Sequence, residues 1–161
     1  GEPLLQFLFL ITLFKKLKQE GIPTAIDTSG MVDITDSIQE LISLTDLFLL
    51  DIKHIDSKKS KELVGFSNEK ELAFAKYLSD HQKKMWIRQV LIPGYTDSEE
   101  DLLRLKDFVS TLETVEKIEI LPYHSMGEFK WKNLGYTYEL EGVPDATTED
   151  VVRAKKILGI V

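Results

Sequence analysis

Apolar and polar positions alternate along the chain in a way that predicts four strands, each followed by a helix. The predicted strands cover 23–27, 46–53, 85–92 and 117–121. Between them, apolar residues recur at the three- and four-residue spacing of amphipathic helices. Strands that alternate with helices are typical of a parallel sheet with right-handed crossovers. The pattern therefore predicts an α/β fold.

The start and end signals of the helices are clear in the sequence. Pro3 suits the first turn of a helix that runs to Gln19, and this helix is so apolar that we expect it to be heavily buried. Further helices are predicted after four caps, some of them capping boxes with an acid three residues on. These caps are Thr35 or Asp36, Asn68 with Glu71, Thr96 with Glu99, and Thr147 or Thr148. A loop of about twenty residues after His124 is expected to be functional or mobile.

The stretch from Asp46 to His54 is the most informative of the chain. Its apolar run, 47–50, shows no polar alternation, which predicts a strand covered on both faces. Asp51 and Lys53 follow two residues apart, so their side chains point to the same face. Opposite charges thus leave a strand at its carboxyl end, where parallel α/β folds hold ligands. A plain ion pair at a strand exit is the alternative reading.

Other strand ends carry polar groups too. Asp27 ends the first predicted strand, Arg88 interrupts the third, and His124 follows the fourth. We expect these groups to meet Asp51 and Lys53 at one rim and to grip a ligand with both a carboxylate and an amine. Asp27 and Asp51 could share a cation. His54 and His81 are predicted to be surface residues.

Length and composition limit the possibilities further. A closed barrel of eight units needs about 250 residues, so 161 residues fit a small open sheet or an arc of a barrel. A net charge of −7 gives no basic footprint for nucleic acid. The apolar start is too short to span a membrane, and it suggests an excerpt of a longer chain. The absence of cysteine excludes disulfides and thiolate metal sites within these residues.

Several sequence blocks resemble one family closely. They are Gly1-Glu2, Asp27-Thr28-Ser29-Gly30, Leu50-Asp51-Ile52-Lys53, Trp86-Ile87-Arg88, Ile92-Pro93-Gly94-Tyr95-Thr96-Asp97 and Leu121-Pro122-Tyr123-His124. In type and spacing they are similar to the activating enzymes of pyruvate formate-lyase, which are radical S-adenosylmethionine enzymes. The resemblance implies a partial parallel (β/α) barrel, of which residues 1–161 are a single-domain arc of four β/α units without its first strands.

The resemblance also implies a reaction. Enzymes of this family use a [4Fe-4S] cluster to cleave S-adenosylmethionine to a 5′-deoxyadenosyl radical, which then generates the glycyl radical of pyruvate formate-lyase. It further implies a cytoplasmic protein, an electron donor such as flavodoxin, and neither nucleic acid nor membrane as partner.

Matching positions suggest roles for individual residues. Residues similar to S-adenosylmethionine-binding positions are Gly1, Glu2, Asp51, Ile52, Lys53, Arg88 and His124. Asp27, Asp51 and the carbonyl of Leu49 match a monovalent-cation site. The loop with Lys130 and Trp131 is a candidate partner contact.

One departure from the family pattern is decisive for activity. The family holds its cluster with three closely spaced cysteines, and this sequence has none. We expect the cluster ligands to lie upstream of Gly1 and this chain alone to be inactive. The alternatives are a cluster-free α/β domain that binds an anionic metabolite or a protein, and a lyase or aldolase with Lys53 as its Schiff-base lysine.

Overall fold

The computed structural model of the chain describes residues 1–160 and confirms the α/β prediction. Four parallel strands form one sheet in the order β1-β2-β3-β4. Their bounds are β1 Ala25–Thr28, β2 Leu47–Asp51, β3 Lys84–Leu91 and β4 Val115–Pro122. Sequential strands are therefore spatial neighbours, as in an arc of a β/α barrel.

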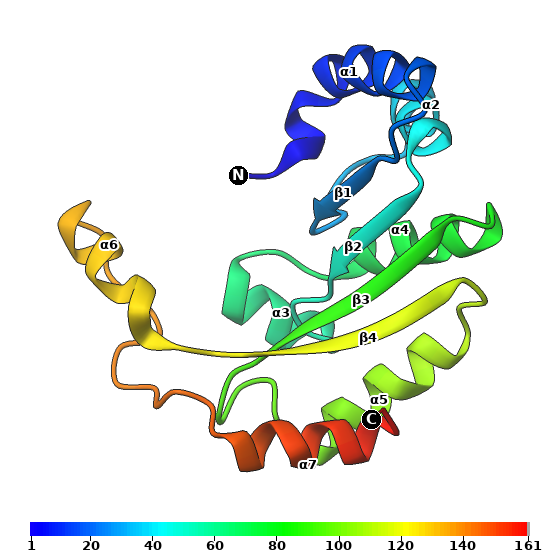
Figure 1. Cartoon of the computed structure of the whole chain (residues 1–161). Coiled ribbons are helices and arrows are strands. Elements are labelled where there is room, and N and C mark those ends of the chain that lie inside the picture. Colours follow the sequence, from blue (N-terminus) through cyan, green and yellow to red (C-terminus); the bar gives the residue numbers. More distant parts are fainter. Residues whose placement is uncertain (161) are drawn as a thin grey trace.

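The helices cover the outer side of this curved sheet, while α6 projects away from it (Figure 1). Their bounds are η1 Pro3–Gln6, α1 Phe7–Gln19, α2 Asp36–Leu44, α3 Ser57–Val64, α4 Glu69–Asp80, α5 Glu99–Ser110, η2 Ser125–Gly127, α6 Glu128–Asn133 and α7 Thr148–Leu158. The predicted long loop after His124 thus contains two short helices. Within residues 1–160, none of the helices combines the length and the apolar character that crossing a membrane requires.

Burial alternates along β1, β2 and β3, so the prediction that both faces of β2 are covered is wrong. Phe48 and Leu50 are fully buried beneath the helices, whereas Leu47 and Leu49 on the other face are only half-buried. The inner face is open because four strands form an arc and do not close around it. A site on this inner face is accessible to a ligand.

The first helix also differs from its prediction. It begins as the 3-10 turn η1, in which Glu2 caps the backbone N–H of Leu4, and continues as α1. It is not heavily buried, because Leu5, Leu8 and Phe9 are largely exposed. Only one stripe of α1 packs against the core, and the chain described here has no element that covers the opposite stripe.

Two predicted caps have different partners. The side chain of Asn68 does not cap α4; its amide donates to the carbonyls of His54 and Ile55. The α5 cap is Ser98, which accepts from the backbone N–H of Asp101, because Thr96 is used within the preceding turn. Other caps are as predicted: Thr35 starts α2 and Thr147 forms a capping box with Asp150.

Candidate functional site

Arg88 lies at the centre of a charged cluster on the inner face of the sheet. Its Nε donates to Asp51 Oδ1 at 2.7 Å, and its Nη1 donates to Asp27 Oδ2 at 2.7 Å. Its Nη2 contacts both carboxylates. Arg88 is therefore paired with two acids, which offsets the cost of placing a charge within a strand.

The register of the sheet explains why these residues meet. Asp51 on β2 pairs directly with Arg88 on β3, and Asp27 on β1 pairs with Leu49. Paired residues point to the same face, and so do residues two apart on one strand. Asp27, Leu49, Asp51 and Arg88 consequently share the open inner face.

Lys53 extends the cluster beyond the end of β2. Its Nζ lies 2.7 Å from Asp51 Oδ2, which confirms the predicted side-by-side arrangement. The cluster then holds two carboxylates and two cations. Burial works to lower the pKa of Arg88, yet its bonds to Asp27 and Asp51 outweigh burial and raise that pKa. Arg88 stays charged, and the cluster offers both signs at one place.

Glu2 joins the amino-terminal segment to the end of β1. Its carboxylate accepts from Thr28 Oγ1 at 2.6 Å and from the N–H and hydroxyl of Ser29 at 3.0 and 2.9 Å. Burial favours a higher pKa for Glu2, but these hydrogen bonds prevail and lower it. Glu2 is therefore an ionised clamp, while the neighbouring Gly1 is exposed.

Glu71, which the sequence predicts only as the partner of a helix cap, is a buried acid. Its side chain is 1% exposed, and its Oε1 accepts the backbone N–H of Lys53 at 3.1 Å. Burial raises its pKa to about 8, although Lys53 acts in the opposite direction. The sequence carries little indication of this contact: it shows only an acid in the first turn of the predicted helix.

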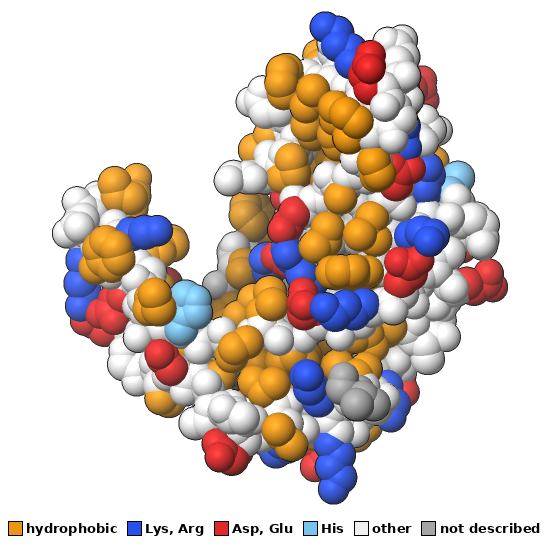
Figure 2. Space-filling view, in the orientation of Figure 1, with side chains coloured by type: hydrophobic (Ala, Val, Ile, Leu, Met, Phe, Trp, Pro, Cys, Tyr) orange, Lys and Arg blue, Asp and Glu red, His pale blue; other side chains and the backbone are white. Residues whose placement is uncertain are grey.

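An open cavity of about 750 Å³ lies beside Lys53, between η1 and the helices α3 and α4. Glu2, Ser29, Lys53 and Glu71 contribute its polar lining, and Met31, Val64 and Phe66 are among its apolar residues. In Figure 2 acidic and basic side chains gather on the hollowed side of the molecule, near the ends of β1 and β2. The cavity is large enough for a small-molecule ligand.

The structure does not bring His124 into contact with this cluster. Arg88 is in register with Glu119, and His124 lies five residues further along the chain. That separation is roughly 16 Å of extended strand. Only an extended ligand could reach both. Ile52 is fully buried, so it can offer a ligand only its backbone, of which the N–H donates to the carbonyl of Arg88.

The expected cation site contains a guanidinium. Arg88 Nη2 contacts Asp27 Oδ1 and Asp51 Oδ1 together, which is the position that a shared cation would need. Across residues 1–160, no three His, Cys, Asp or Glu side chains are grouped to hold a metal ion. The prediction that Asp27, Asp51 and Leu49 bind a monovalent cation gains no support from this geometry.

The predictions for two histidines had different outcomes. His81 is exposed, as predicted, and stacks on Tyr77. His54 is buried at 2% exposure, so its prediction as a surface residue is wrong. The chain turns inward after Lys53, and both ring nitrogens of His54 have backbone partners, the carbonyl of Tyr95 and the N–H of Asp56.

Comparison with known proteins identifies the family. The Radical SAM superfamily matches residues 1–105, which is more than half of the chain. This chain belongs to the radical SAM superfamily. It is 48% identical over 163 aligned residues to the pyruvate formate-lyase-activating enzyme of Streptococcus mutans, covering 98% of this chain and 62% of that protein. It is 52% identical over 159 residues to the enzyme of the same name from Staphylococcus epidermidis, covering 96% and 63%.

Solved structures share the fold of this chain. A domain of pyruvate-formate lyase-activating enzyme from Bacteroides vulgatus superposes with a TM-score of 0.81 at 26% identity, over 99% of this chain and 89% of that domain. A radical SAM methyltransferase from Sphaerobacter thermophilus, at 16% identity, shares the fold with a TM-score of 0.71 over 99% of this chain and 46% of that one. The chain spans a little over three fifths of the sequence relatives it matches, 62% and 63%.

Proposed function

We propose that this radical SAM chain is the S-adenosylmethionine-binding part of a pyruvate formate-lyase activating enzyme. The observation that carries the proposal is the cluster of Asp27, Asp51, Lys53 and Arg88 beside an open cavity. The identity of about 50% to enzymes of that name supports it. Domain organisation is part of the proposal: residues 1–161 form a single-domain arc of the barrel.

The charges of the cluster suit the methionine moiety of the cofactor. That moiety carries an ammonium and a carboxylate, and the cluster offers two acids and two cations. We assign the ammonium to Asp51 and the carboxylate to Lys53 and Arg88, since charge-assisted hydrogen bonds are the strongest available. Glu2 and Gly1 border the methionine, the backbone of Ile52 lies next to it, and His124 contacts the adenosyl end.

The residues of this chain fit S-adenosylmethionine, but they do not fit a [4Fe-4S] cluster. Iron–sulfur clusters need thiolates, and the chain contains no cysteine. The ligands of the [4Fe-4S] cluster thus belong to residues outside this chain. When bound, cluster and cofactor supply the radical chemistry, whereas these residues hold and orient the cofactor. We expect no 5′-deoxyadenosine from this chain with S-adenosylmethionine and a reductant.

Further parts of the proposal come from the family. The protein substrate is pyruvate formate-lyase, the electron donor is a flavodoxin-type protein, and the compartment is the cytoplasm. Lys130 and Trp131, on the projecting α6, contribute to contact with the protein substrate. A monovalent cation at Asp27, Asp51 and the Leu49 carbonyl would first have to displace the Arg88 guanidinium.

Isothermal titration with S-adenosylmethionine tests the proposal. Asp51→Asn should weaken binding at least tenfold, because it removes the acid that touches both Lys53 and Arg88. Asp46→Asn is the matched control. Asp46 precedes the opposite end of the same strand and also pairs with a lysine, Lys18, so its variant should bind as the wild type does. Equal affinity in all three proteins would sink the proposal.

The alternatives make different predictions in the same assay. A cluster-free domain that binds an anionic metabolite would bind small carboxylates without adenosine as tightly as it binds S-adenosylmethionine. A Schiff-base role needs a neutral Lys53, but Lys53 forms an ion pair with Asp51 at 2.7 Å. The geometry therefore favours binding of a zwitterion over imine chemistry.

A further inference from the structure

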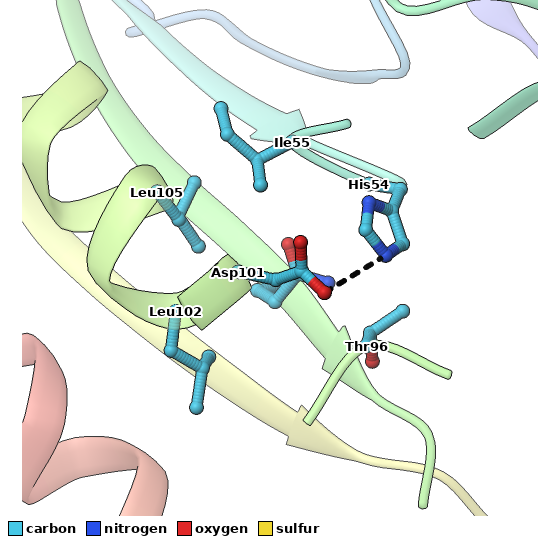
Figure 3. A pocket seen from close by; sticks show the side chains of 7 residues that line it. His54, Ile55, Thr96, Asp101, Leu102 and Leu105 are labelled. Atoms are coloured by element: carbon cyan, nitrogen blue, oxygen red, sulfur yellow. Dashed lines mark ion pairs between the residues drawn. The ribbon is translucent and has the colours of Figure 1, made fainter. Parts of the chain in front are cut away.

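A small cavity, lined mostly by buried residues, lies on the opposite side of the sheet from the charged cluster, between α5, β3 and the segment that follows β2. Its volume is about 10 Å³, which is about the space that one water molecule needs. Figure 3 shows the carboxylate of Asp101 in the middle of this space, with His54 and Thr96 on one side and Leu102 and Leu105 on the other. The cavity is thus bounded by polar and apolar groups together.

Asp101 is the group that this cavity leaves incomplete. Its side chain is 3% exposed. Its Oδ2 accepts from Lys59 Nζ at 2.6 Å and from the Ser98 hydroxyl at 2.5 Å. Its Oδ1 is buried and has no hydrogen-bond donor among residues 1–160. The cation that approaches this oxygen, Arg104 Nη1, stays at 3.7 Å, which is too far for a hydrogen bond.

The other polar groups around the cavity do not donate to Asp101 Oδ1. His54 accepts the N–H of Asp56 on Nδ1, so its proton is on Nε2 and is donated to the carbonyl of Tyr95. Thr96 donates to the carbonyl of Val90. Gln89 donates its amide to the same carbonyl. The Gln89 side-chain oxygen remains as a second acceptor.

The charge balance decides what kind of ligand fits. Asp101 is the acid that lines the cavity, and Lys59 pairs with it at 2.6 Å. His54 Nε2 lies 3.7 Å from Asp101 Oδ2, but His54 is neutral because its Nδ1 accepts a hydrogen bond, so Lys59 balances the charge of Asp101. A further cation is therefore not required, and a neutral donor with two protons suits two acceptors.

We propose that the cavity holds a single buried water molecule that donates to Asp101 Oδ1 and Gln89 Oε1. The water joins the first turn of α5 to β3, directly beside His54. Since His54 follows Lys53 in the chain, this water helps to fix the segment that carries Lys53. The proposal is independent of the proposed function.

Two measurements test the water. An atomic-resolution crystal structure of this chain, or of a longer chain that contains it, should show one ordered water within hydrogen-bond distance of Asp101 Oδ1. In solution, magnetisation transfer from water to the Nε2 proton of His54 should reveal a long-lived bound water. An empty cavity, or density with the short multi-oxygen coordination of a cation, would overturn the proposal.

Paired variants connect the water to its partners. Gln89→Leu keeps the approximate size of the side chain but removes the second acceptor, so the signal of the bound water should disappear. Lys59→Met is the control, because Lys59 contacts the other oxygen of Asp101 and does not line the cavity. The control should keep the water. Loss of the water signal in both variants, or in neither, would contradict the assignment of these partners.

Discussion

Arg88 and Glu71 are two ionisable residues that the fold shields from water, and the first is kept charged whereas burial favours the neutral form of the second. Arg88 is paired with two acids and remains charged. Glu71 has a backbone N–H as its partner, and burial raises its pKa to about 8. The sequence predicted that a charge within β3 must be paired. It could not reveal the role of Glu71, because that contact depends on how α4 packs beside Lys53.

Glu71 should make the stability of the chain depend on pH. A raised pKa means that the folded chain holds a proton that the unfolded chain has released, so stability falls as the pH rises from 4.5 towards about 8. Glu71→Gln should remove this fall. Above that range the variant should be more stable than the wild type by about 5 kcal/mol in urea denaturation, and near the lower end the two should be similar.

Glu69, two residues earlier on α4, is the contrast for this prediction. Hydrogen bonds from Ser67 and Ser57 lower its pKa, so ionised Glu69 stabilises the fold above the ordinary Glu pKa and loses that effect on acidification. Glu69→Gln should therefore be less stable than the wild type at neutral pH and equal to it in acid. The same pH profile for both variants would contradict the assignment at Glu71.

At the level of the secondary-structure elements, the turn after β1 brings the backbone close to the core. Gly30 has a φ of +68°, and a Cβ there would lie 2.9 Å from Leu50 Cδ1 and from Phe74 Cδ1. The Asp27-Thr28-Ser29-Gly30 block therefore needs glycine for two reasons, a left-handed backbone and close approach to the core. The second reason could not be predicted from the sequence, because the contact involves β2 and α4.

Two alanine variants separate these reasons. Gly21 has nearly the same φ, +69°, and no heavy atom within 4 Å of a Cβ. Gly21→Ala should cost about 1 kcal/mol of unfolding free energy for the backbone alone. Gly30→Ala should cost about 3 kcal/mol, since overpacking adds to the strain. Equal losses in denaturation would show that the close approach at Gly30 does not matter.

At the scale of the molecule, the sheet is an arc with helices outside and an open inner face (Figure 1). Parallel pairing and the convergence of Asp51, Lys53 and Arg88 could be predicted, because strands that alternate with helices are parallel and the ends of parallel strands meet at one rim. The open inner face could not be predicted, because an apolar strand gives the same sequence signal whether or not a second layer covers it. The distance of His124 from the charged cluster could not be predicted either, because it depends on the register between β3 and β4.

The exposed apolar stripe of η1 and α1 should make the isolated chain associate. Leu5, Leu8 and Phe9 are exposed at 78%, 66% and 64% and lie close together on one segment. Exposed apolar patches drive association. Sedimentation velocity should show an average mass that rises with concentration, and the double variant Leu8→Lys and Phe9→Glu should remove the rise. Val152→Lys, at a lone exposed apolar residue of α7, is the control and should leave the association unchanged.

Binding of S-adenosylmethionine at the charged rim can be observed by titrating it into the isotope-labelled chain and following the backbone amide signals. We predict saturable shifts at Glu2, Ser29, Lys53 and Arg88, where the charged cluster and the open cavity meet. Amides of α5 and α7, on the other side of the sheet, should not move. An unchanged spectrum, or shifts confined to α5 and α7, would contradict the claim that this rim binds the cofactor.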